Sequence, residues 1–144
     1  MKKTIYLLIF CCLFFCHIDI SAQTVEGKWY SLDPDDQKET IIELYRKDDK
    51  LYGKVIALLQ DEDRKKTCRK CPDLYKDKPI LGLEILRDFT YEDDLWTNGV
   101  ILIPKTGKEY QCNISVDDTG RLVIRGYIGF SLLGRSTYWY PVES

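Results

Sequence analysis

Two cysteines three positions apart are the first residues whose types and spacing could do chemistry. The stretch TCRKCPD places Cys68 and Cys71 in a C-x-x-C arrangement, which can serve as a redox pair, as half of a zinc site or as a disulfide that closes a tight loop. Positive charge lowers a thiol pKa and would favour redox work. Five basic residues supply such charge here: Arg64, Lys65, Lys66, Arg69 and Lys70.

The first residues of the chain have the pattern of a secretory signal. Lys2 and Lys3 precede an almost unbroken apolar run over 5–16, and Ser21 and Ala22 supply the small residues of a cleavage site. We expect cleavage after Ala22, so that 1–22 is a removed signal peptide and 23–144 is a single domain. The apolar run is short for a bilayer, which disfavours a permanent membrane span. A lipoprotein acylated at Cys16 is a weaker alternative, because bulky Phe15 precedes that cysteine.

Removal of the signal peptide limits the catalytic and metal-binding chemistry that is possible in the mature domain. The one histidine of the chain, His17, lies in the removed segment, so the mature domain lacks a Ser-His-Asp triad, a Cys-His nucleophile and a histidine-ligated metal site. A zinc site would need four ligands, and Cys112 is the one further cysteine. A thioredoxin-like pair would need a βαβ setting that this region does not show. We therefore expect no enzyme, metal or cofactor, but a Cys68–Cys71 disulfide and a buried, inert Cys112.

The charge balance and the acidic clusters add two exclusions. The mature domain carries 19 basic and 22 acidic residues, a net charge of −3, which does not support nucleic-acid binding. The carboxylates gather in DPDDQKE, DEDR, YEDD and DDTG, none of which has the ligand spacing of an EF-hand loop. We interpret them as turns between strands, where Asp is common.

Short alternating apolar runs predict that the elements carrying these residues are strands. We expect strands over 25–32, 39–47, 50–59, 80–87, 98–103, 108–116, 121–128 and 134–142. Turn residues at hairpin spacing join several of them, which favours an all-β, antiparallel, up-and-down barrel of about eight strands. The exception is the polar segment 60–78, which holds the cysteine pair and room for one helical turn.

Several motifs, in their order along the chain, resemble a known family. EGKWYS, GKVIALL, KPILGLEIL, PKTGKEYQCNISV and LVIRGYIGFSLLGRSTYW together resemble the secreted bacterial family DUF2147, a domain of unknown function, over nearly the whole mature chain. The resemblance implies a calycin-like barrel without an assigned reaction. Gly27-Lys28-Trp29 also resembles the G-x-W opening of lipocalins. Cys68 and Cys71 depart from the polar loop of many related sequences.

The barrel interpretation leads to a functional hypothesis. An eight-stranded barrel either fills with side chains or holds one small ligand, so we expect an exported protein, periplasmic or secreted, that binds a small apolar or amphipathic molecule. The candidate ligand contacts are Tyr110, Tyr138 and Trp139. The alternative is a structural or protein-interaction module of the cell envelope that uses the barrel's outside or the segment 60–78.

Closure of such a barrel requires its first and last strands to pair. GKWYS should then lie beside GRSTYWY, with Trp29 near one end of the interior. By analogy with lipocalins, an arginine should lie over that indole. Arg135 is the first candidate and Arg125 the second, both with a structural role.

Overall fold

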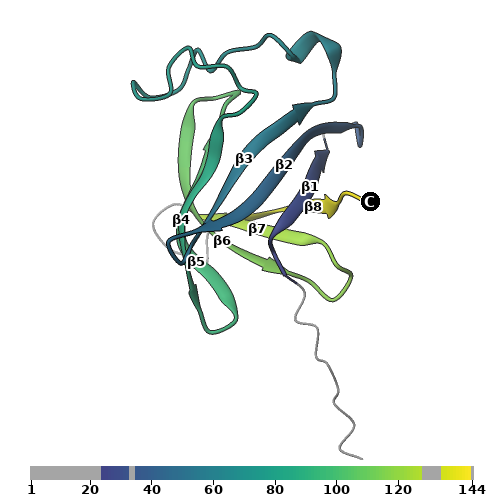
Figure 1. Cartoon of the computed structure of the whole chain (residues 1–144), viewed down its shortest axis with the longest axis vertical. Coiled ribbons are helices and arrows are strands. Elements are labelled where there is room, and N and C mark those ends of the chain that lie inside the picture. Colours follow the sequence, from purple (N-terminus) through teal and green to yellow (C-terminus); the bar gives the residue numbers. More distant parts are fainter. Residues whose placement is uncertain (1–23, 33–34, 128–133, 144) are drawn as a thin grey trace, which may run out of the picture.

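A computed structural model describes residues 24–32, 35–127 and 134–143, which form a closed antiparallel barrel (Figure 1). The strands in these residues are β1 (Gly27–Leu32), β2 (Lys38–Lys47), β3 (Lys50–Leu58), β4 (Glu84–Glu92), β5 (Leu95–Ile103), β6 (Lys108–Val116), β7 (Leu122–Tyr127) and β8 (Arg135–Pro141). One 3-10 turn, η1 (Asp61–Asp63), follows β3. The expected signal peptide, 1–22, lies outside the described residues. No helix in the described ranges has the length and apolar character needed to cross a membrane.

Each strand pairs with its neighbour in sequence, and β1 closes the barrel against β8. The closing pairs are Trp29 with Pro141 and Tyr30 with Tyr140. The fold class predicted from the sequence, an antiparallel up-and-down barrel, is therefore confirmed. Figure 1 shows the long β3–β4 connection and the β4–β5 turn at opposite ends of this barrel. The end of the barrel with the β3–β4 connection is called the open end, and the end with the β4–β5 turn is called the closed end.

Alternation along the strands explains why this sequence forms a barrel. In β6, Cys112 and Ile114 are buried while the intervening Asn113 is less so, because successive strand side chains point to opposite faces. Large apolar side chains with the same alternation fill much of the interior: Trp29, Ile42, Leu44, Leu51, Val55, Leu86, Phe89, Trp96, Ile114, Leu122, Ile124 and Trp139.

Two strands begin or end three or more residues away from the positions expected from the sequence. The strand expected over 80–87 is β4 (Glu84–Glu92), and that expected over 98–103 begins earlier, at Leu95. We interpreted all of YEDD as a loop, whereas the turn is confined to Asp93 and Asp94, both with positive φ. Two left-handed residues suit a tight hairpin, and Asp tolerates that conformation. Tyr91 and Glu92 are therefore free to continue the strand.

The closed end is covered by an arginine on a tryptophan, but not by the expected pair. Arg46 lies over the Trp96 ring at 5.3 Å and forms an ion pair with Glu26 at 3.0 Å. Arg135 lies on β8 six residues before Pro141, the partner of Trp29. Six strand residues span about 20 Å, which is too far for a guanidinium to reach Trp29. Arg125 follows the buried Ile124 on β7 and so starts from the outer face, whereas Trp29 is buried.

The indole N–H of Trp29 instead has its hydrogen-bond acceptor in the backbone before β1. Its indole N–H donates to the Val25 carbonyl at 2.9 Å, and both residues are buried. A buried indole N–H needs an acceptor, and the chain entering β1 supplies it. Trp29 is thus a structural residue of the barrel wall.

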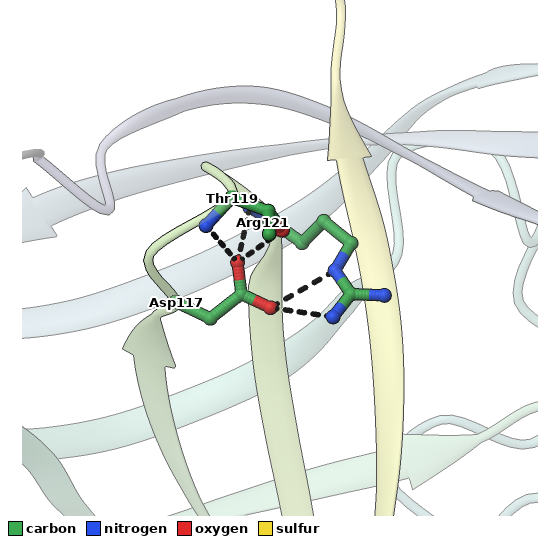
Figure 2. Close-up of polar contacts among 3 residues, drawn as sticks. All are labelled: Asp117, Thr119 and Arg121. Atoms are coloured by element: carbon green, nitrogen blue, oxygen red, sulfur yellow. Dashed lines mark hydrogen bonds and ion pairs between the residues drawn. The ribbon is translucent and has the colours of Figure 1, made fainter.

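Figure 2 shows how one carboxylate organises the hairpin between β6 and β7. Asp117 Oδ1 accepts from the Thr119 N–H, the Thr119 hydroxyl and the Arg121 N–H at 2.9, 2.6 and 3.0 Å. Asp117 Oδ2 accepts from Arg121 Nε at 2.9 Å. Hydrogen bonds from Thr119 and Arg121 hold the pKa of Asp117 well below its usual value, because they stabilise the ionised form.

We predict that Asp117→Asn lowers the unfolding midpoint at neutral pH. The lowered pKa means that the carboxylate stabilises the fold above the ordinary Asp pKa of about 3.9, and that this contribution is lost as pH falls toward the folded value. Thermal unfolding should therefore show a gap between wild type and variant that narrows below about pH 4. Asp118→Asn, in the same turn but without these hydrogen bonds, is the control. A gap that stays constant across this range would contradict the assignment.

The Phe89 ring fills the space that a side chain at Gly99 would occupy. Phe89 on β4 is fully buried, and a Cβ built on Gly99 of β5 would lie 2.3 to 2.4 Å from its ring carbons. Real carbon atoms do not approach so closely. Gly99 is therefore required by packing, since the wall must leave room for the Phe89 ring.

Gly99→Ala should destabilise the fold by about 1 to 3 kcal/mol, the usual cost of overpacking a core. Gly126→Ala is the matched control, because its added Cβ would meet Tyr110 Cβ at 3.9 Å, an ordinary contact. Denaturant midpoints of the two variants measure the difference. Equal midpoints would show that Phe89 moves away at little cost.

Candidate ligand-binding cavity

The open end of the barrel contains two adjoining cavities. The larger has a volume of about 530 Å³ and the smaller about 200 Å³. Ile101, Ile103 and Trp139 line both, so the two spaces are neighbours. Together they form the candidate site, called the open-end cavity below.

The larger cavity is mainly apolar, with a few polar groups. Among the described residues, its lining is formed by Ile101, Ile103, Tyr110, Ile124, Gly126, Tyr127, Arg135, Thr137 and Trp139. Strand pairing places Thr137 beside Ile124 and Arg135 beside Gly126. Arg135 and Thr137 are exposed, whereas Ile124 and Trp139 are buried. The cavity therefore leads from a polar, solvent-exposed side to an apolar floor.

The smaller cavity lies toward the β1–β2 and β3–β4 connections. Its lining includes apolar side chains from β2 to β5 and four charged residues, Glu39, Asp63, Lys66 and Lys105. Lys105 pairs with Glu39 at 2.5 Å, and Lys66 forms an ion pair with Asp63. These opposite charges neutralise each other around an apolar space.

The structure brings together two of the three aromatic residues considered as ligand contacts. Tyr110 and Trp139 line the larger cavity. Tyr138 does not, since it is 41% exposed and its ring lies under the Arg121 guanidinium at 4.3 Å. Adjacent strand residues face opposite sides of a sheet, so Tyr138 and Trp139 could not both point inward.

Sequence reasoning missed several residues of this cavity. Ile101, Ile103 and Ile124 were not among the candidate contacts, and Arg135 was expected to lie over Trp29. A period-of-two signal was available, because Arg135, Thr137 and Trp139 alternate along one strand and must share a face. Register between strands was the missing information.

The cysteine pair lies outside the cavity and fastens a loop to the barrel. Cys68 and Cys71 form the expected disulfide, with a Cα–Cα distance of 5.3 Å. The Cys68 N–H donates to the Lys78 carbonyl at 2.8 Å, and Thr67 bridges to Pro79. The two arms of the loop are therefore tied together, which supports a structural role for the disulfide.

Two further contacts hold this loop on the sheet. The Arg87 guanidinium of β4 lies 4.7 Å from the centre of the Tyr75 ring and pairs with Glu109 of β6 at 2.6 Å. A Cβ on Gly107 would collide with the Lys70 carbonyl oxygen, so the loop backbone rests directly on the β5–β6 turn. This contact fixes one side of the open end.

The groups with strongly raised pKa values are not poised for chemistry. Cys112 is a free, buried cysteine, as expected, and burial raises the pKa of its thiol to about 12. Burial, with a hydrogen bond to Glu84, also raises the pKa of Tyr45 to about 12. Neither residue lines the open-end cavity. A protonated thiol is a poor nucleophile.

A closed eight-stranded barrel with a cavity at one end defines a lipocalin-like protein. Protein HP1028 from the human pathogen Helicobacter pylori, described as belonging to the lipocalin family, matches the chain with a TM-score of 0.71 and 17% identity. The match covers 83% of this chain and 84% of that one. At this identity it shows the fold alone, and it confirms the lipocalin-like prediction.

The family itself follows from the sequence match. Residues 27–140 match the model of DUF2147, described as an uncharacterized protein conserved in bacteria. The chain belongs to this family, as the motif resemblance predicted. No curated protein matches the chain.

We predict one titratable thiol in the denatured, unreduced protein that begins at Gln23, and three after reduction, because Cys68 and Cys71 are bonded and Cys112 is free. In the native protein near pH 8, Cys112 should resist alkylation, since its pKa lies far above that pH and the side chain is buried. Counting thiols with a chromogenic reagent checks all three states. Three reactive thiols before reduction would contradict the disulfide.

Proposed function

We propose that the protein is an exported, non-enzymatic lipocalin-like barrel that binds one small apolar or amphipathic molecule in its open-end cavity. The observation that carries this proposal is the cavity of about 530 Å³ lined mainly by isoleucine and aromatic side chains. Small-molecule sites commonly measure about 300 to 1,000 Å³, with an apolar lining and a few polar groups. The cavity fits this description.

The position of the cavity supports binding from solution. Arg135 and Thr137 are exposed at one side, and Trp139 is buried at the floor. An apolar chain lying against Trp139, Ile101 and Ile124 would leave water for an apolar surface. Burial of apolar area contributes about 25 cal/mol per Å², which drives such binding without specific polar contacts.

The residues around the cavity support binding in place of catalysis. The described residues include no group of three or more His, Cys, Asp or Glu side chains that could hold a metal ion. The two carboxylates of the smaller cavity, Glu39 and Asp63, are engaged with lysines. Neither is a free general base. We therefore propose carriage or sequestration of the ligand.

Export is supported by two independent features of the chain. The residues 1–22 have the pattern of a secretory signal. The Cys68–Cys71 disulfide suits an oxidising compartment. A periplasmic or secreted location is the one that both features favour.

The alternative function, an envelope interaction module, has its own supporting observation. Leu74 and Leu81 in the β3–β4 connection are 68% and 49% exposed. Single exposed leucines are common on protein surfaces, whereas an apolar cavity with a few polar groups is the usual form of a small-molecule site. The cavity is thus the more specific indication, and ligand binding is the function we favour.

Filling the cavity should abolish binding without unfolding the barrel. Ile103 lines both cavities, so Ile103→Trp should reduce the affinity for a neutral fluorescent naphthylamine probe at least tenfold. The matched control is Val123→Trp, which adds the same group on the outer face beside Tyr138. Fluorescence titration measures affinity, and a denaturant midpoint confirms folding. Absence of probe binding to the wild-type protein, or equal binding to the folded Ile103→Trp variant, would contradict the proposal.

A further inference from the structure

The charges around the open-end cavity are unequally compensated, and this indicates the chemistry of the ligand. Five charged residues from the described ranges line the two spaces. Four of them form the pairs Lys105–Glu39 and Lys66–Asp63. Arg135 is the fifth, and within the described part of the chain it has no ion pair and no side-chain hydrogen bond. The described lining therefore carries one uncompensated positive charge.

Strand register directs this charge toward the cavity. Arg135 pairs with Gly126, which in turn pairs with the buried Cys112 of β6. Directly paired residues share a face of the sheet, so Arg135 belongs to the inner face. Gly126 has no side chain to block the approach of its neighbour. The Arg135 side chain therefore leaves the backbone on the inner face of the barrel, at the exposed edge of the cavity.

Neutral donors lie near the same charge. Thr137 is two residues further along β8 and faces the same side, and Tyr110 lines the same cavity from β6, on the other side of β7. The described residues provide no hydrogen-bond partner for either hydroxyl group. An anion held by Arg135 would find further donors here, and hydrogen bonds to an ionised acceptor are the stronger kind.

We propose, on the basis of the binding function above, that the ligand is an anionic amphiphile: a molecule with one apolar chain and a carboxylate or phosphate head. The head pairs with Arg135 at the exposed edge, with Thr137 and Tyr110 as additional donors. The chain lies along Ile101, Ile124 and Trp139 toward the smaller cavity. A cationic head would meet the uncompensated guanidinium, so the same charge excludes cationic amphiphiles.

Four probes with the same sixteen-carbon chain test this assignment: palmitate, hexadecyl phosphate, hexadecanol and hexadecyltrimethylammonium. Their affinities are measured below the concentrations at which they aggregate, by displacement of the neutral naphthylamine probe. In the wild-type protein both anions should bind more tightly than the alcohol, and the cation most weakly. Because Arg135 is exposed, we expect a modest anion-to-alcohol preference of about three- to tenfold. The stronger of the two anions identifies the head group.

Arg135→Gln should lower the affinity for both anions until it approaches that for hexadecanol, and Arg135→Lys should retain part of the preference. Arg125→Gln is the matched control. Arg125 pairs with Ser136 and Asn113, and so lies on the opposite face of β7 from Gly126. The preference should also shrink as salt is added, because Arg135 is accessible to solvent.

Two results would overturn the assignment. Equal affinities of wild type for palmitate, hexadecyl phosphate and hexadecanol would show that the head group is not recognised. An unchanged anion-to-alcohol ratio in Arg135→Gln would show that another group recognises it. In both cases the amphiphiles still bind, so the proposed function stands. If no probe binds to the wild type, including hexadecanol and the naphthylamine, the proposed function itself fails.

Discussion

Closure between β1 and β8 is the constraint on which the rest of this barrel depends. It rests on two residue pairs, Trp29 with Pro141 and Tyr30 with Tyr140, and Pro141 has no N–H to donate. The Tyr30 and Tyr140 rings stack at 5.5 Å on one side of this junction. The Val142 N–H extends the closure by donating to the Lys28 carbonyl at 3.0 Å. A one-residue slip would turn Trp29 to the other face, because strand side chains alternate with a period of two.

The same alternation gives the two ends of the barrel different interiors. Toward the closed end, Phe89 fills the space left by Gly99, and Arg46 covers Trp96 beneath the entering chain. Toward the open end the lining includes isoleucines and Gly126, which leave space beside Trp139. The distribution of large and small side chains along the strands therefore produces a barrel that is filled at one end and hollow at the other.

The surface ion pairs around the barrel contribute to shape more than to stability. Arg46–Glu26 is exposed on both sides, and exposed pairs contribute about 0.2 to 1 kcal/mol. The ion pair with Glu26 holds the Arg46 side chain across the Trp96 ring. At the open end, by contrast, two ion pairs leave Arg135 as the charge available to a ligand. Charged side chains thus help to cover one end, and we propose that at the other end they select the ligand.

Much of this architecture could be predicted from the sequence, because it depends on local patterns. Alternation and turn residues predicted the strand order, and the motifs from GKWYS to GRSTYWY predicted the family that 27–140 match. The compartment expected from residues 1–22 led to the Cys68–Cys71 disulfide that the structure contains. These inferences needed no knowledge of which strands lie across from each other.

The parts that could not be predicted depend on register and on side-chain volume across the interior. Arg135 was placed over Trp29 by analogy, although the two lie toward opposite ends of the β1–β8 junction. Tyr138 was grouped with Trp139, although neighbours in a strand face opposite sides. Whether the interior is full or hollow depends on how Phe89, Trp96 and Trp139 are distributed around the barrel, which no single stretch of sequence specifies.

The most direct test of a hollow, ligand-binding open end is an isotope-filtered nuclear Overhauser experiment on the protein with a bound hexadecyl chain. We predict contacts between the chain protons and the methyl groups of Ile101, Ile103 and Ile124, which line the cavity. Contacts confined to the exposed Leu74 and Leu81 of the β3–β4 connection would contradict it. They would place the chain on the outside of a barrel that holds no ligand.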